Sequence, residues 1–383
     1  MAQDEVFFPV RKTNWVNIVF FSITAFLGVV GTPIYLYYFG ISASEILLFV
    51  FYLIVAPLSI TSGYHRLFAH VTYQANALVR FLFLFFGAAA YEQSALKWAS
   101  QHRDHHRYVD TERDPYSIKK GFFHAHMGWL LFWERPIHYE NVKDLQKSRL
   151  ISHQHRYYRI WSLTSGILLP LLIGALTGHL IGAFFLSVCL RLALIHHATF
   201  CINSVCHAFG KATFDIYSSA RDHWATALMT YGEGYHNFHH HFPADYRNGV
   251  RWYQWDPTKW LITLLEKAGF AWNLKRVSRF RILAAKLTAE NQRICDQLKT
   301  DRYIPNLQTI LTLVNTHYEK LRQALSDWER SAKEYQDLLS KRIAHRSDVI
   351  YQEALYRMCE ARGRFRHSLT MWHALPRKRL ALA

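Results

Sequence analysis

Long runs of apolar residues, separated by polar stretches, predict four membrane-spanning helices. One apolar block, 160–202, is interrupted at Thr177-Gly178-His179, and its roughly 43 residues suffice for two helices of about 20 residues, the length that crosses a bilayer. Two further runs lie nearer the start of the chain. We therefore expect spans at about residues 15–39, 46–62, 160–177 and 180–202.

A fifth apolar run, 77–91, needs a different interpretation. It has only about 15 residues, which is short for a span. It also separates two polar stretches that both contain clustered histidines, and a single crossing would place those stretches on opposite sides of the membrane. We therefore expect an interfacial or partly buried helix here.

The distribution of positive charge predicts the orientation. The linkers 40–45 and 174–179 contain no Lys or Arg, whereas the stretch 64–159 contains many. Because cytosolic loops carry an excess of Lys and Arg, we expect this stretch, both termini and the region after residue 202 in the cytosol. The membrane would be the inner membrane of a bacterium or the endoplasmic reticulum of a eukaryote.

The chain changes character at about residue 275. Residues 275–383 hold 22 Lys or Arg and 11 Asp or Glu, which is +11 of the formal net charge of +17. Apolar residues such as Val314, Leu321 and Leu325 recur at helical spacing in 307–343. We expect a membrane domain, 1–274, followed by a basic helical cytosolic extension, 275–383.

The net positive charge by itself is equally compatible with binding to nucleic acid and with binding to anionic lipid headgroups. The four apolar spans favour the lipid bilayer and disfavour a nucleic-acid partner. The five cysteines show neither a Cys-x-x-Cys pair nor a disulfide framework, which indicates a reducing compartment.

Three histidine clusters carry the candidate chemistry. Two of them have the pattern His-x-x-His-His, in which positions i, i+3 and i+4 share one side of a helix. The third has two histidines five residues apart, directly after the second predicted span. The clusters are His65 and His70; His102, His105 and His106; and His236, His239 and His240.

Neutral imidazole binds iron, copper, zinc and nickel, and eight clustered histidines exceed the four to six ligands that one metal needs. Two metals are therefore expected. Soluble di-iron bundles use two Glu-x-x-His pairs, but this chain has one such spacing, Glu233 to His236, so a carboxylate-bridged site is disfavoured. Ligand type alone leaves iron, copper and zinc open.

At these residues the chain resembles the membrane fatty-acyl desaturases, and among them the delta-9 acyl-CoA type. The resemblance covers about residues 14–272 and includes the order and spacing of the three clusters. It also includes the runs 121–123, 128–131, 203–207 and 232–240, and Phe242-Pro243. It implies an all-α integral membrane protein with four transmembrane helices and a cytosolic helical cap that holds a histidine-rich two-metal site.

The resemblance further implies residue roles that the spacing does not give. Two iron ions would be held by the eight clustered histidines and by His207, with a water held to one iron by Asn203. Trp98 and Thr199 match positions at the bend of an acyl tunnel, and Leu53 and Pro57 lie near its expected end. Lys119 and Lys120 are candidate contacts for the substrate headgroup.

The implied reaction uses O2 and two external electrons to place a cis double bond in a long acyl chain, at carbon 9. Acyl-CoA is favoured over acyl-lipid as the carrier, although Ser100 and Gln101 replace the Arg-Asp of animal members at a headgroup position. The sequence has no His-Pro-Gly-Gly haem motif, so we expect a separate electron donor of the cytochrome b5 or ferredoxin type, with its reductase.

Two other functions remain open at this point. A membrane hydroxylase of alkane, sterol or lipid shares the histidine clusters, and the run Asn203 to His207 favours a desaturase over it. A metal transporter would need histidines or carboxylates inside the spans, whereas these histidines gather beyond the predicted span ends.

Overall fold

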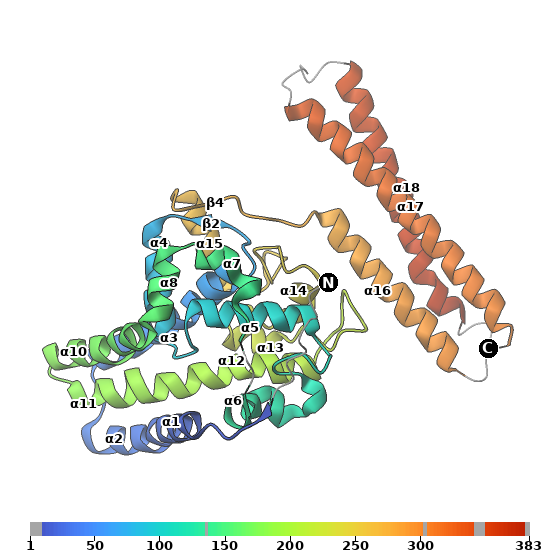
Figure 1. Cartoon of the computed structure of the whole chain (residues 1–383). Coiled ribbons are helices and arrows are strands. Elements are labelled where there is room, and N and C mark those ends of the chain that lie inside the picture. Colours follow the sequence, from blue (N-terminus) through green and yellow to red (C-terminus); the bar gives the residue numbers. More distant parts are fainter. Residues whose placement is uncertain (1–9, 135–136, 302–304, 341–348, 380–383) are drawn as a thin grey trace. The chain divides into compact units, whose positions relative to one another are not determined.

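The computed structural model describes residues 10–134, 137–301, 305–340 and 349–379. Contacts divide the chain into two compact units. The first comprises Met1–Ala212 and Tyr217–Arg276, and the second comprises Thr213–Ile216 and Val277–Ala383. Figure 1 shows that almost all of the regular structure is helical, which confirms the expected all-α fold.

Four helices in the first unit are long and apolar enough to cross a membrane, as expected. Each is a continuous rod in which α-helical and wider π-helical turns follow one another, and their bounds are Trp15–Phe39, Ala43–Ala69, Tyr158–Leu176 and Leu180–Ala208. The rods comprise α1 (Trp15–Phe26), α2 (Thr32–Phe39), α3 (Ala43–Leu58), α9 (Tyr158–Leu163), α10 (Leu169–Leu176), α11 (Leu180–Gly182) and α12 (Arg191–Ala208), with π-helical turns at Leu27–Gly31, Ser59–Ala69, Thr164–Leu168 and Ala183–Leu190.

The second and fourth rods are longer than the sequence predicted, because the apolar pattern stops where polar residues enter the protein interior. The second rod continues from the expected residue 62 to Ala69, and every residue of its last part, Ser59–Ala69, is buried. The fourth continues from residue 202 to Ala208. These extensions beyond the predicted apolar spans carry candidate ligands.

A break in hydrogen bonding accompanies the change of helix type in the second rod. Pro57 has no N–H, so the carbonyl of Leu53 loses its helical partner. The hydroxyl of Tyr231 donates to this carbonyl instead, at 2.9 Å. Tyr231, which precedes the third histidine cluster, thereby replaces the helical hydrogen bond that Pro57 cannot make in the second rod.

The first, second and fourth rods meet at the buried carboxylate of Glu45. Glu45 caps the start of α3 together with Ser42, and its Oε1 accepts a hydrogen bond from the Tyr35 hydroxyl at 2.6 Å. A Cβ on Gly182 would lie 1.4 Å from the same oxygen. A glycine is therefore required where the fourth rod passes this capped turn.

Shorter helices cover one end of the rods. The apolar run after the first histidine cluster forms α4, Ala77–Ala88, which is too short to span, as expected. The others in this unit are α5 (Ala95–Tyr108), α6 (Trp129–Phe132), α7 (Lys143–Gln146), α8 (Arg149–Arg156), α13 (Trp224–Met229), α14 (His236–His241) and α15 (Pro257–Lys267), with short 3₁₀ or π turns at Ile118–Lys120, His124–Gly128 and Tyr139–Val142.

Two antiparallel pairs of very short strands complete the first unit. Strand β1, Val10–Arg11, pairs with β3, Trp133–Glu134, and β2, Gln74–Ala75, pairs with β4, Ala271–Trp272. The second pair ties the segment after α15 back to the chain that follows the first histidine cluster.

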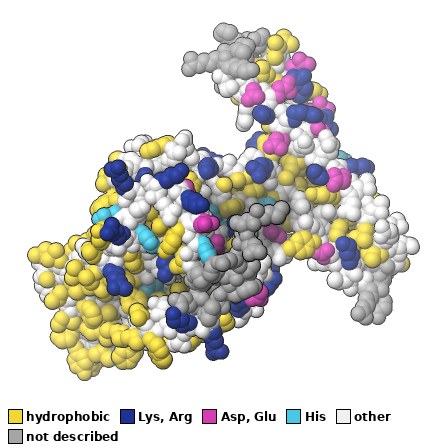
Figure 2. Space-filling view, viewed as in Figure 1, with side chains coloured by type: hydrophobic (Ala, Val, Ile, Leu, Met, Phe, Trp, Pro, Cys, Tyr) yellow, Lys and Arg dark blue, Asp and Glu magenta, His cyan; other side chains and the backbone are white. Residues whose placement is uncertain are grey.

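The surface of the first unit separates by polarity. In Figure 2, hydrophobic side chains form a continuous area where Figure 1 places α1, α2, α10 and α11, while Lys and Arg gather over the short helices. Exposed side chains of this area include Val29, Tyr37, Leu172 and Ile181. This distribution is that of helices facing lipid below a polar cap.

The second unit consists of three long helices, α16 (Arg279–Thr300), α17 (Leu307–Ser340) and α18 (Val349–Arg379). Helices α17 and α18 lie side by side (Figure 1). Val314, Leu321 and Leu325 are buried in their shared core with Trp372, which confirms the predicted helical spacing over 307–340. The last part of the predicted segment, 341–343, lies outside the described residues.

Candidate metal centre

The first histidine pair lies where the second rod ends. His65 belongs to the π-helical part, Ser59–Ala69, and His70 is the residue that ends it. Arg103 fixes this end, because its guanidinium donates to the carbonyls of Phe68 and Ala69 at 2.9 and 2.8 Å. Arg103 comes from the second cluster, so one side chain joins the first two clusters.

The second and third clusters lie on α5 and α14, and each divides its histidines between two sites. Residues i and i+4 of a helix are about 40° apart, whereas i+3 lies on the other flank of the same side. His102 and His106 face one site and His105 the other. On α14, His236 and His240 face the second site and His239 the first. The spacing predicted that the three rings of each cluster lie on one side of a helix, and the packed structure divides them between the two groups.

The nine histidines named from the sequence form two compact groups. The ligand atoms within each group all lie within 4.8 Å of one another. The five-histidine group comprises His65, His70, His102, His106 and His239, and the four-histidine group comprises His105, His207, His236 and His240.

The Nε2 atom of every one of these rings points inward. His65 and His106 each place Nε2 2.9 Å from Nε2 of His239. In the second group, His236 Nε2 lies 3.0 Å from Nε2 of both His207 and His240. Nitrogen ligands at about 2.1 Å from one metal, at right angles to each other, are about 3.0 Å apart, so these separations fit a shared ion.

Burial keeps most of these rings neutral. It lowers the pKa well below the usual value of histidine, and neighbouring imidazoles lower it further, for His70, His102, His106, His239 and His240. The pKa of His236 falls to about 3 for the same reasons. A neutral imidazole keeps a free lone pair, so at neutral pH these rings are competent ligands for a transition metal.

The ninth ring and its neighbour could not be selected by spacing. His207 lies one turn after Asn203 on α12, in the extension beyond the predicted fourth span. His207 Nδ1 lies 2.6 Å from the Ser219 hydroxyl, which leaves Nε2 facing the four-histidine group. Asn203 lines the adjoining cavity together with His236. The only signal in the sequence was the family resemblance.

A cavity of about 610 Å³ adjoins both groups. His65 and His102 from the first group line it, and His236 from the second. Most of the remaining lining is apolar and comes from the spanning rods. The predicted tunnel residues Trp98, Thr199, Leu53 and Pro57 all line this cavity.

Glu92 is a lining residue that the sequence analysis did not single out. Its carboxylate accepts hydrogen bonds from Thr199 Oγ1 at 2.8 Å and from Trp98 Nε1 at 3.2 Å. Burial raises the pKa of the carboxyl to about 7, although these two hydrogen bonds act to lower it. Glu92 thus joins the two residues predicted at the tunnel bend.

The two candidate headgroup lysines make contacts with the loop after α5. Lys119 Nζ donates to the carbonyl of Asp110 at 2.7 Å, and Lys120 Nζ lies 3.4 Å from a carboxylate oxygen of Glu112. Neither residue lines the cavity. Their binding of a headgroup stays a prediction.

Arg191 in the fourth rod is fully buried. Its guanidinium donates to the carbonyls of Ala89, Gly166 and Ser187 at 2.6, 2.9 and 2.6 Å. It therefore joins the end of α4 to the third and fourth rods, beside the cavity-lining residues Tyr91 and Ala193.

Sequence comparisons identify a protein family whose matched region contains both histidine groups. The family model described as "Fatty acid desaturase" matches residues 44–276, the range that contains all nine histidines. The chain is 41% identical to Acyl-CoA desaturase 1 of Saccharomyces cerevisiae over 293 residues, 74% of this chain and 56% of that protein. It is 34% identical to Stearoyl-CoA desaturase 4 of Mus musculus over 291 residues, 72% of this chain and 79% of that protein.

A probable acyl-CoA desaturase of Schizosaccharomyces pombe is also 41% identical, over 69% of this chain and 55% of that protein. The chain thus spans little more than half the length of the two yeast relatives. Because the family model covers well over half of the chain and includes both histidine groups, the chain belongs to the fatty acid desaturase family.

Proposed function

We propose that this protein is an oxygen-dependent fatty-acyl desaturase that places a cis double bond, at carbon 9, in a long saturated acyl chain. The observation that carries the proposal is the pair of buried histidine groups opening onto one largely apolar cavity. The printed names of the relatives, which are acyl-CoA and stearoyl-CoA desaturases, favour acyl-CoA over acyl-lipid as the substrate.

The proposed metals are two iron ions. The five-histidine group would hold one and the four-histidine group the other, with Asn203 near the second. An unactivated C–H bond has no acidic proton, so acid–base side chains cannot break it, and the irons supply the oxidising chemistry when bound. The balanced reaction joins two hydrogens from the acyl chain, O2, two electrons and two protons to give one alkene and two waters.

The residues of the chain would bind and position the substrate and exclude water. The apolar rods would surround the acyl chain, and Trp98, Thr199 and Glu92 would set which methylenes face the metals. Leu53 and Pro57 line the same cavity and would contact the methyl end. Lys119 and Lys120 would contact the headgroup.

The proposed setting is a membrane with the histidine groups and both termini on the cytosolic side. The Lys and Arg residues over the short helices support that orientation. Two electrons would come from a separate cytochrome b5-type or ferredoxin-type donor, and a basic surface suits an acidic donor.

Expression of the full chain in a desaturase-deficient host tests the reaction. We expect a new cis mono-unsaturated acid in membrane lipids, with the double bond at carbon 9. His106→Ala removes a ring of the five-histidine group and should abolish the product, whereas His317→Ala in the second unit should leave it. Hydroxylated acids without an alkene would instead identify the protein as a hydroxylase.

A further inference from the structure

Each histidine group has one ring whose outer nitrogen faces a buried carboxylate. In the five-histidine group, Nδ1 of His65 lies 2.8 Å from Oε2 of Glu233. In the four-histidine group, Nδ1 of His105 lies 2.9 Å from Oδ1 of Asp114. Both carboxylates are almost inaccessible to solvent, at 3% and 2% exposure. The sequence analysis did not name Asp114, and it considered Glu233 only as part of a Glu-x-x-His spacing, typical of a carboxylate-bridged site that it disfavoured.

A carboxylate on Nδ1 decides what the other nitrogen can do. A neutral imidazole carries one N–H, and the group that accepts from Nδ1–H leaves Nε2 with a free lone pair. Nε2 is the atom that His65 and His105 turn into their groups, 2.9 Å from Nε2 of His239 and 3.2 Å from Nε2 of His240. The hydrogen bond between His105 Nδ1 and Asp114, and the close approach of the Glu233 carboxylate to Nδ1 of His65, favour the tautomer that binds a metal through Nε2.

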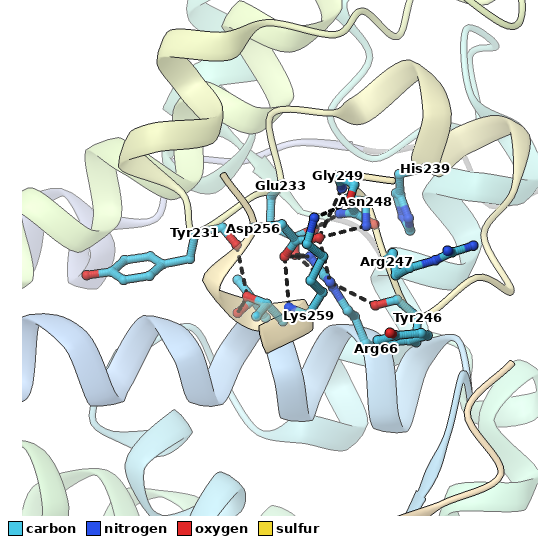
Figure 3. Close-up of polar contacts among 12 residues, drawn as sticks. Arg66, Tyr231, Glu233, His239, Tyr246, Arg247, Asn248, Gly249, Asp256 and Lys259 are labelled. Carbon is cyan, nitrogen blue, oxygen red and sulfur yellow. Dashed lines mark hydrogen bonds and ion pairs between the residues drawn. The ribbon is translucent and has the colours of Figure 1, made fainter. Parts of the chain in front are cut away.

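Glu233 is itself anchored by the residue next to His65. Figure 3 shows Arg66 between two carboxylates: its Nη2 lies 2.9 Å from Oε1 of Glu233 and 3.0 Å from Oδ1 of Asp256. Asn248 Nδ2 donates to the second oxygen of Glu233 at 2.8 Å. Every one of these side chains is buried, so Glu233 has little freedom to turn away from His65.

Asp256 extends the anchor along the chain that follows the third cluster. Its oxygens accept from the backbone N–H groups of Asn248, Gly249 and Lys259 at 2.9 to 3.0 Å, and it caps the start of α15. Two acidic residues and Arg66 therefore form a compact buried ionic network that connects the first histidine cluster to the third. Buried charges are retained only when paired and hydrogen-bonded in this way.

We propose that Glu233 and Asp114 are positioning residues of the two metal sites, one for each site. Glu233 orients His65 in the five-histidine group, and Asp114 orients His105 in the four-histidine group. Arg66 and Asp256 hold Glu233 in place. The inference rests on the proposed metal centre and adds which residues outside the ligand set govern metal retention at each site.

Release of iron to a chelator tests the proposal without reference to activity. The full chain, purified in detergent and loaded with ferrous iron, is mixed with ferrozine, and iron release is followed by absorbance. Wild type should hold two irons that leave slowly. Glu233→Gln should release one iron about 10–100-fold faster and the other at the wild-type rate, because partners outside the ligand set contribute affinity of this size.

Asp114→Asn should show the same pattern, and the double variant should release both irons fast, because the two substitutions act on different sites. Asp245→Asn is the matched control, since Asp245 is buried beside Arg247, at 2.8 Å, and belongs to neither group. It should release both irons at the wild-type rate. Glu233→Asp keeps the charge beside Arg66 but shortens the reach to His65, and it replaces Glu233→Gln if that variant does not fold.

The outcomes separate the possible failures. Wild-type release rates in every variant would overturn the proposal, and so would a single variant that releases both irons equally fast. A double variant with only one fast iron would also overturn it, because both carboxylates would then serve the same site. A wild-type chain that binds no iron would refute the proposed metal centre itself.

Discussion

Burial changes the protonation of a carboxyl group in the wall of the cavity. This group belongs to Glu92. A carboxyl group inside an apolar cavity loses hydration that its charged form needs, and this loss outweighs the hydrogen bonds from Thr199 and Trp98. The result is a group that changes charge near neutral pH in the wall of the proposed acyl tunnel.

Glu92→Gln should alter the pH dependence of stability. The folded-state pKa of about 7 lies above the ordinary value of 4.5, so the folded protein binds the proton more tightly. This contribution is fully present below pH 4.5 and is lost as pH rises through 7, a loss of roughly 3 kcal/mol. Glutamine is neutral throughout, so the variant should show a smaller fall in melting temperature between pH 6 and pH 8.

Thermal unfolding of both proteins in the same detergent at the two pH values measures this difference. Glu290→Gln in the second unit is a suitable control, and it should reproduce the wild-type dependence. An equal fall in melting temperature for wild type and Glu92→Gln would show that Glu92 stays ionised throughout.

Helices are joined in this protein by polar side chains that satisfy backbone carbonyls. Arg191 donates to carbonyls of three helical segments. Its Cζ atom also lies 5.3 Å from the centroid of the Tyr52 ring. The carbonyl of Ala89 ends α4, which leads into the cavity-lining residues after it. The site therefore depends on how these helices are held as well as on its ligands.

Arg191→Met should lower the free energy of unfolding by about 2–4 kcal/mol, because three buried carbonyls lose a charged hydrogen-bond donor. Thermal unfolding in detergent measures the loss. Arg191→Lys keeps the charge but lacks the planar fork, so it should recover only part of the stability. A melting temperature unchanged in Arg191→Met would show that the three hydrogen bonds contribute nothing net.

The chain separates into a unit that holds both histidine groups and a second unit of long helices. The family match ends at residue 276, and both histidine groups lie in the first unit. The second unit has its own buried core, which includes Leu321, Phe365 and Trp372. Its long amphipathic helices were predictable from sequence because their apolar spacing is regular.

Removal of residues 277–383 should leave two irons per chain, because every proposed ligand and both carboxylate partners belong to the first unit. Iron content of the purified truncated chain, normalised to protein, measures this. The full-length His106→Ala variant provides the low-iron reference. Loss of both irons on truncation would show that the second unit is needed to build the site.

The sequence by itself determined the elements and the kinds of chemistry. Runs of apolar residues gave the four spans, and the spacing of histidines on helices gave a two-metal interpretation, because both are local patterns with a fixed period. His207 and the tunnel residues came only through resemblance. The helices that contain the second and fourth predicted spans continue beyond those spans, because a helix can extend past its apolar residues into a polar interior.

Only the tertiary structure decided how the histidines are divided between two groups, and which carboxylates contact the Nδ1 atoms of His65 and His105. His65 and Glu233 are far apart in the chain, as are Thr199 and Glu92, and no local periodicity connects them. Their contacts arise because helices pack at particular angles and depths, which brings side chains from separate segments to the same buried point. Eight of the nine candidate ligands could thus be predicted from spacing, whereas the assignment of each one to a group required the packed fold.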